Sequence, residues 1–76
     1  MSKSVYFRTA LTGGSGIALD GIDGAVLNDG DAAFVMVAGT FYAYLLDADS
    51  AAAESSPSII KPDTNAGDKR WIRQTV

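Results

Sequence analysis

The 76-residue sequence contains no cysteine and no histidine. Without cysteine the chain can have no disulfide framework, no thiolate nucleophile and no cysteine-bound metal. Without histidine it lacks the commonest transition-metal ligand and the base that would activate a serine. Paired carboxylates could act as acid and base, but a domain of this size has little room for a cleft around them. We therefore expect no enzymatic activity, no cofactor and no bound metal ion.

The sequence also lacks any long apolar run. The N-terminal residues MSKSVYFRTA are too polar for a signal peptide, and no later segment approaches the length of a membrane span. We expect a soluble protein that is not secreted and does not enter a membrane. The net charge of -3 gives no basic excess with which to bind nucleic acid.

Positive charge is missing from the middle of the chain. Acids and no bases occur between Asp20 and Glu54, and every lysine and arginine lies outside that stretch. Such charge runs usually keep turns in water. The alternative is that the basic ends of one copy meet the acidic middle of another and orient assembly. The aspartates from Asp20 to Asp31 lack the spacing of an EF-hand loop, which favours turn formation over an adventitious cation.

The usual supports of a small fold are therefore absent. A domain of this size buries only roughly 60% of the surface that its unfolded chain exposes. We expect residues 1–76 to form a single domain that depends on a compact apolar core or on other copies of itself.

The strongest local pattern predicts a β-hairpin from Ala32 to Leu46, with its turn at Ala38-Gly39. Glycine can adopt the positive φ that a tight hairpin turn requires. Alternate residues of the second strand point to opposite faces, with Phe41, Ala43 and Leu45 on one and Tyr42, Tyr44 and Leu46 on the other. Both faces are apolar. We expect the hairpin to be covered on both sides, or to show one side to a partner chain.

Weaker patterns predict further elements around the hairpin. Two more strands are expected at Lys3 to Arg8 and Arg70 to Thr75, and short helical turns at Leu19 to Leu27 and Ser50 to Glu54. Pro62 stops any strand that begins at Ile59-Ile60. We expect this apolar pair to anchor the long loop after the hairpin to the core. The predicted fold class is mainly all-β. It is a small antiparallel sheet or barrel of about four to five strands with one or two short helical turns.

The glycine-rich stretch GGSGIALDG, Gly13 to Gly21, fits no ligand-binding loop. A phosphate loop needs lysine where Ile22 stands, and a dinucleotide fingerprint needs glycine where Leu19 stands. A calcium repeat needs aspartate where Ala18 stands. We interpret Gly13 to Gly16 as a flexible joint after the first strand.

Aromatic residues supply the candidate contact sites. Amphipathic rings give large contact areas at low entropic cost, so they can bind a subunit or a carbohydrate, or can pack in a core. The residues that we expect to make packing or subunit contacts are Val35, Tyr42, Tyr44 and Trp71.

The order of these pieces resembles a known module. The chain has an acidic turn NDGD, the hairpin AAFVMVAGTFYAY, an acidic loop DADSAAAESSP, then IIKPD and a closing KRWI. Together they resemble a small β module that recurs in structural proteins of bacteriophages and prophages, particularly tail fibres, tail spikes and other virion appendages. The resemblance covers residues 19–72. It leaves residues 1–18 as an N-terminal strand and glycine-rich joint.

The resemblance implies a structural or connective role without catalytic residues. It implies a homo-oligomer, most often a trimer, that assembles with other virion proteins. The expected location is the virion, and the cytoplasm of the bacterial host during assembly. The alternatives are a receptor- or glycan-binding module that uses exposed aromatic rings and a monomeric regulator expressed from a prophage.

Overall fold

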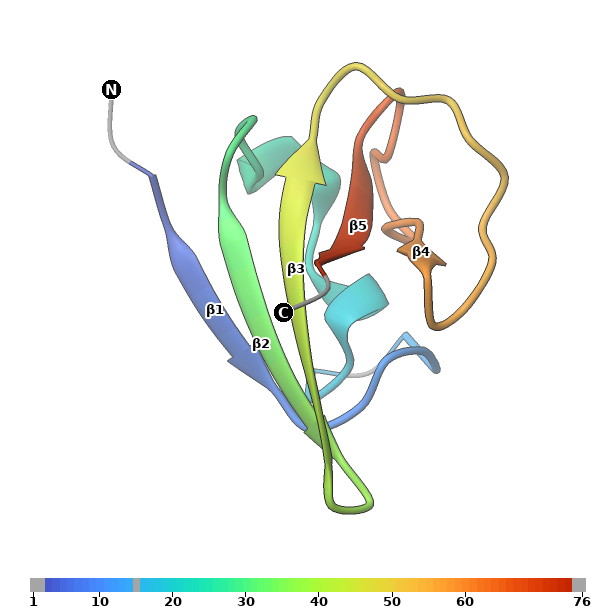
Figure 1. Cartoon of the computed structure of the whole chain (residues 1–76). Helices are drawn as coiled ribbons and strands as arrows, with labels where there is room; N and C mark the ends of the chain where they lie inside the picture. Colours follow the sequence, from blue (N-terminus) through green and yellow to red (C-terminus); the bar gives the residue numbers. More distant parts are fainter. Residues whose placement is uncertain (1–2, 15, 75–76) are drawn as a thin grey trace.

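One five-stranded sheet organises the chain (Figure 1). The computed structural model describes residues 3–14 and 16–74. The strands are β1 (Val5–Arg8), β2 (Ala32–Val37), β3 (Thr40–Asp47), β4 (Ile59–Ile60) and β5 (Arg70–Gln74), in the order β1-β2-β3-β5-β4 across the sheet. Two short 3-10 helices, η1 (Leu19–Gly21) and η2 (Gly24–Val26), lie between β1 and β2. The predicted mainly β fold class is confirmed.

The sheet is mixed, whereas the sequence predicted an antiparallel one. β1 runs parallel to β2, and the other neighbouring strands are antiparallel. A parallel pair needs a long connection that crosses from one end of the sheet to the other. Residues 9–31 form this crossover. In the described residues β1 and β4 are the two edges of the sheet, so the predicted barrel alternative does not apply.

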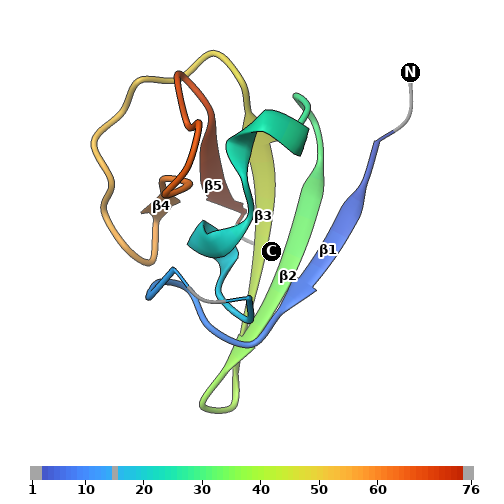
Figure 2. The same ribbon diagram turned by 180° about the vertical axis from the view of Figure 1, so that it is seen from behind.

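The crossover covers one face of the sheet, which we call the inner face (Figure 2). Its residues Leu19, Ile22 and Leu27 are buried, as the predicted helical turn required, and they join one hydrophobic cluster with the sheet. The sheet residues of that cluster are Ala33, Val35, Tyr44, Leu46, Ile60 and Trp71. Gly24 lies so close to the backbone of Asn65 that a β-carbon there would collide with it.

Hydrogen bonds hold the glycine-rich stretch to neighbouring residues. The Leu19 amide donates to the Ala10 carbonyl at 2.8 Å, and the Gly14 amide donates to the Asp20 carboxylate at 2.9 Å. Ser15, in the middle of the predicted joint, lies outside the described residues. The stretch is therefore a loop of the crossover, whose two ends are held together by hydrogen bonds.

The hairpin has the predicted turn. Ala38 has φ of 50° and Gly39 has φ of 81°, the two positive values of a type I′ turn. This turn matches the twist of the strands, so the pairing continues without a break from Ala32 opposite Leu45 to Val37 opposite Thr40.

The long loop from Ala48 to Lys69 has no helical turn, so the turn predicted at Ser50 to Glu54 is wrong. Alanine and serine side chains offer little to bury, and Arg70 contacts this backbone instead. Arg70 is 7% exposed, and its guanidinium donates to the carbonyl oxygens of Ala52, Gly67 and Lys69. Ile60 is fully buried, which confirms its predicted anchoring role.

Asp31 fixes the upper end of the sheet, where β3 ends. Its carboxylate is fully buried and accepts hydrogen bonds from the Ser4 amide at 2.9 Å and the Asn28 amide at 2.8 Å. Its carbonyl oxygen accepts from the Leu46 amide at 2.8 Å. One residue of the predicted turn thereby joins the start of β1, the start of β2 and the end of β3.

We expect Asp31→Asn to lower the free energy of unfolding by about 1–3 kcal/mol. An asparagine side chain has one acceptor oxygen, so one of the two buried amides would face an NH₂ group instead of an acceptor. Thermal unfolding measures the loss, at roughly 4–8 °C per kcal/mol for a domain of this size. Asp49→Asn, the same change at an exposed loop residue, is the control. Equal effects of the two changes would contradict the role of Asp31.

Candidate functional site

The residues that the sequence singled out as contact sites lie on the inner face. Val35, Tyr44 and Trp71 are 0%, 1% and 0% exposed, and Tyr42 is half-buried. Of the two roles expected for these residues, packing or subunit contact, the structure shows packing for Val35, Tyr44 and Trp71, because the crossover covers the tyrosine face. Val35, Tyr44 and Trp71 form the core of the single chain.

Tyr44 is the clearest case. Its hydroxyl donates to the carbonyl oxygen of Pro57 at 2.6 Å and so holds the long loop against the inner face. Burial raises the pKa of Tyr44 to about 12, although the nearby Arg73 guanidinium favours the anion. Arg73 itself lies 4.9 Å from the ring centre of Tyr42.

This pKa predicts a loss of stability in alkali. The phenol keeps its proton in the folded chain up to about pH 12 but loses it near pH 10 when unfolded, so the unfolded state is favoured progressively between these values. We expect the melting temperature of the native chain to fall over this range, and that of Tyr44→Phe to fall less. At neutral pH the variant should be less stable by about 1 kcal/mol, since the Pro57 carbonyl loses its donor. Parallel pH profiles of the two proteins would contradict the assignment.

The opposite face of the sheet has no covering layer among the described residues. The register brings apolar side chains of four strands together on it. We call this surface the open face; its residues are Val5, Phe7, Phe34, Met36, Phe41, Ala43, Leu45 and Ile72. A sheet with one face in water normally carries polar residues there, so this composition is unusual.

A ladder of phenylalanines crosses the lower half of the open face, near the hairpin turn. Phe34 stacks on Phe7 and on Phe41, each at 5.6 Å between ring centres, with interplanar angles of 28° and 16°. Phe7 is 69% exposed and Phe41 is 52% exposed. All three phenylalanines of the sequence thus lie on this surface.

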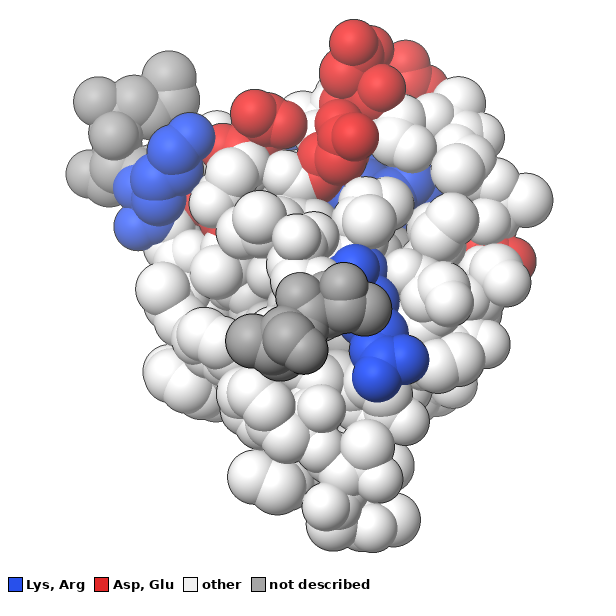
Figure 3. All heavy atoms as spheres, in the orientation of Figure 1, with Lys and Arg blue, Asp and Glu red and all other residues white. Residues whose placement is uncertain are grey.

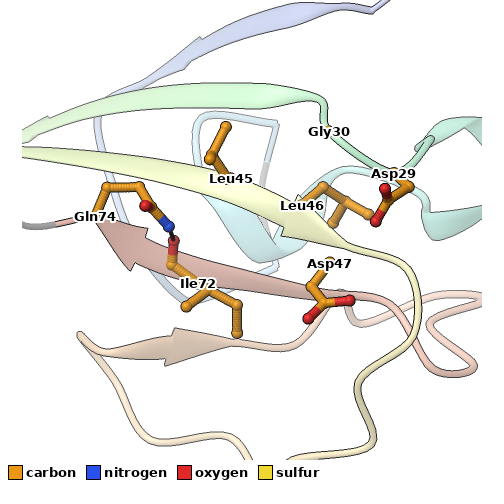
Figure 4. Close-up of a pocket in the computed structure, with 7 residues that line it drawn as sticks. All are labelled: Asp29, Gly30, Leu45, Leu46, Asp47, Ile72 and Gln74. Atoms are coloured by element: carbon orange, nitrogen blue, oxygen red, sulfur yellow. Dashed lines mark hydrogen bonds between the residues drawn. The ribbon is translucent and has the colours of Figure 1, made fainter.

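Two hollows lie at opposite ends of the open face. The lower hollow has a volume of about 370 Å³ and is lined by Phe7, Arg8, Thr9, Phe34, Met36 and Phe41. The upper hollow has a volume of about 430 Å³ and is lined by Asp29, Gly30, Leu45, Leu46, Asp47, Ile72 and Gln74 (Figure 4). Along β3, Phe41 and Leu45 are four residues apart, which separates the hollows by about 13 Å.

Charge is unevenly distributed over this side of the molecule. Figure 3 shows acidic side chains gathered along the upper edge, basic ones at the left and near the middle, and no charge on the lower part of the view. The acidic side chains Asp29 and Asp47 line the upper hollow, and the basic Arg8 lines the lower one. Because Arg8 pairs with Val35, its side chain extends from the inner-face side of β1, so the open face is acidic at its upper end and uncharged at its lower end.

The structure offers no obvious chemistry elsewhere in the described part of the chain. Within residues 3–14 and 16–74, no group of three or more Asp or Glu side chains is placed to hold a metal ion. In the same residues no helix is long and apolar enough to cross a membrane. Comparison with protein-family models, with curated proteins and with solved structures finds no match to this chain. The open face is therefore the candidate functional site.

Proposed function

We propose that this chain is a structural module of a bacteriophage or prophage virion that works by protein–protein assembly and has no catalytic role. The observation that supports assembly is the open face. Its exposed side chains include Val5, Phe7, Met36, Phe41 and Leu45, each between 44% and 69% exposed. A contiguous apolar surface of this kind is typical of an interaction site rather than of a surface that stays in water.

The virion context rests on the sequence resemblance over residues 19–72. The core of the chain uses most of the pieces on which that resemblance depends. The NDGD turn supplies Asp31, the second half of the hairpin supplies Tyr44, and the IIKPD and KRWI pieces supply Ile60 and Trp71. The resemblance implies three copies, whereas the open face of one chain could be covered by a single partner.

The glycan-binding alternative has less support. Its aromatic residues were Tyr42, Tyr44 and Trp71, and the last two have no exposed ring to offer. The exposed rings of Phe7 and Phe41 lack a hydroxyl or an N–H group. Sugar sites need such polar groups to orient the ligand.

We expect the chain to be found in purified virus particles from the bacterial host, and to stay there after a wash in about 1 M salt, which screens charge contacts but not apolar ones. Mass spectrometry of the washed particles measures this. The double variant Phe7→Ser/Phe41→Ser should be lost from the particles. Val26→Ser, which alters a 58% exposed residue of η2 in the crossover, should be retained.

Two results would count against this proposal. One is a chain that is produced in the cell but never enters particles. The other is specific binding of the separate chain to a glycan array, abolished by the Phe7→Ser/Phe41→Ser change, which would favour the receptor-binding alternative.

A further inference from the structure

We infer that the open face is covered by the open face of a second copy of this chain, with the upper end of one copy over the lower end of the other. This pairing deepens the proposed assembly role and rests on it. Two sheets would then form a sandwich, about 10 Å apart, with strands aligned to within about 30°.

The first argument is area. Exposures of 69% for Phe7 and 52% for Phe41 correspond to roughly 100 Å² for each ring. With Val5, Met36 and Leu45 the exposed apolar area reaches roughly 500 Å², at the upper end of what monomeric proteins show. Stable interfaces bury about 800 Å² on each partner, part of it polar rim. Since about 57% of an interface is non-polar, 800 Å² corresponds to about 450 Å² of apolar surface, so the exposed apolar area of one open face matches what a single partner copy would cover.

The second argument is shape. In an isologous pair, a contact between one region and another occurs twice, once in each direction. The upper and lower hollows lie about 13 Å apart on one surface. When the upper end of one copy covers the lower end of the other, the exposed rings of Phe7 and Phe41 of one copy face the hollow beside Leu45 and Ile72 of the other copy.

The third argument is charge. Each copy has a net charge of -3, and acidic side chains gather at the upper rim. β3 has eight residues and so is about 26 Å long. In this orientation the two acidic rims are separated by more than the Debye length of about 8 Å at physiological salt. Asp29 and Asp47 of one copy then lie toward the uncharged lower end of the other, away from the partner's acidic side chains.

The same-end orientation lacks these features. It would place the two upper rims together, with acids facing acids, and the two phenylalanine ladders against each other. Like charges placed opposite each other disfavour that association.

Sedimentation velocity tests the pairing from about 1 μM to about 1 mM. We expect a reversible species of twice the 7.9 kDa chain mass. Phe41→Ser should raise its dissociation constant roughly 100-fold, since each substitution removes two contacts from the pair. Val26→Ser, at an equally exposed residue on the other side of the molecule, should leave it unchanged. Far-UV circular dichroism and melting of the dilute variants confirm that each still folds.

Opposite charges at position 41 test the orientation. Phe41→Glu would face the partner's acidic rim and Phe41→Lys would be attracted to it, so the Glu variant should dissociate more readily by about ten-fold at low salt. The difference should shrink as salt is added. Equal effects of the two variants would overturn this orientation. They would mean that position 41 of one copy faces position 41 of the other, where two glutamates or two lysines repel each other alike.

A chain that stays monomeric up to about 1 mM, a species of three chains, or a pair that Phe41→Ser does not weaken would each overturn the inference. A chain present in virus particles but monomeric in solution would overturn the pairing alone. A chain that pairs in solution but is absent from particles would overturn the virion role alone.

Discussion

The parallel pairing of β1 with β2 determines which face of the sheet stays open. Because the chain must return to the upper end of the sheet to begin β2, residues 9–31 cross one face and cover it. Asp31 secures this arrangement, since its buried carboxylate holds Ser4 before β1 and Asn28 before β2 at the same time. The same pairing sets Phe7 beside Phe34. The parallel pairing of β1 with β2 thus leads to a covered tyrosine face and leaves the phenylalanine face exposed.

The two faces of the sheet therefore differ in role: one forms the core of this small chain, and the other leaves an apolar surface exposed. The inner face buries the large rings of Tyr44 and Trp71, and the Tyr44 hydroxyl is bound to the Pro57 carbonyl. The open face uses rings and aliphatic side chains without polar groups, so its only means of attraction are burial and packing. Acidic residues at its upper end can select the orientation of a partner without contributing much to affinity.

The sequence predicted much of the local structure but not which face of the hairpin is covered. The turn at Ala38-Gly39, the two apolar faces of the hairpin and the anchor at Ile60 follow from local composition, and the structure confirms them. Which face is covered depends on the direction of β1, and a short strand such as Val5–Arg8 carries no local signal of its direction. Tyr42 and Tyr44 were predicted as contact residues because rings with hydroxyl groups are common at interfaces. No contact was predicted for Phe7 or Phe34. The sequence places one phenylalanine in each of three strands. Only the register of β1 against β2 shows that Phe7 lies beside Phe34 on the same face.

The most direct test of the account is an isotope-filtered nuclear Overhauser experiment on a mixture of labelled and unlabelled chains. It detects only contacts between different copies. The account predicts contacts from the ring protons of Phe41 in one copy to the methyl groups of Leu45 and Ile72 in the other. Contacts confined to the rings of Phe41 in both copies, or no contact between copies at all, would contradict it.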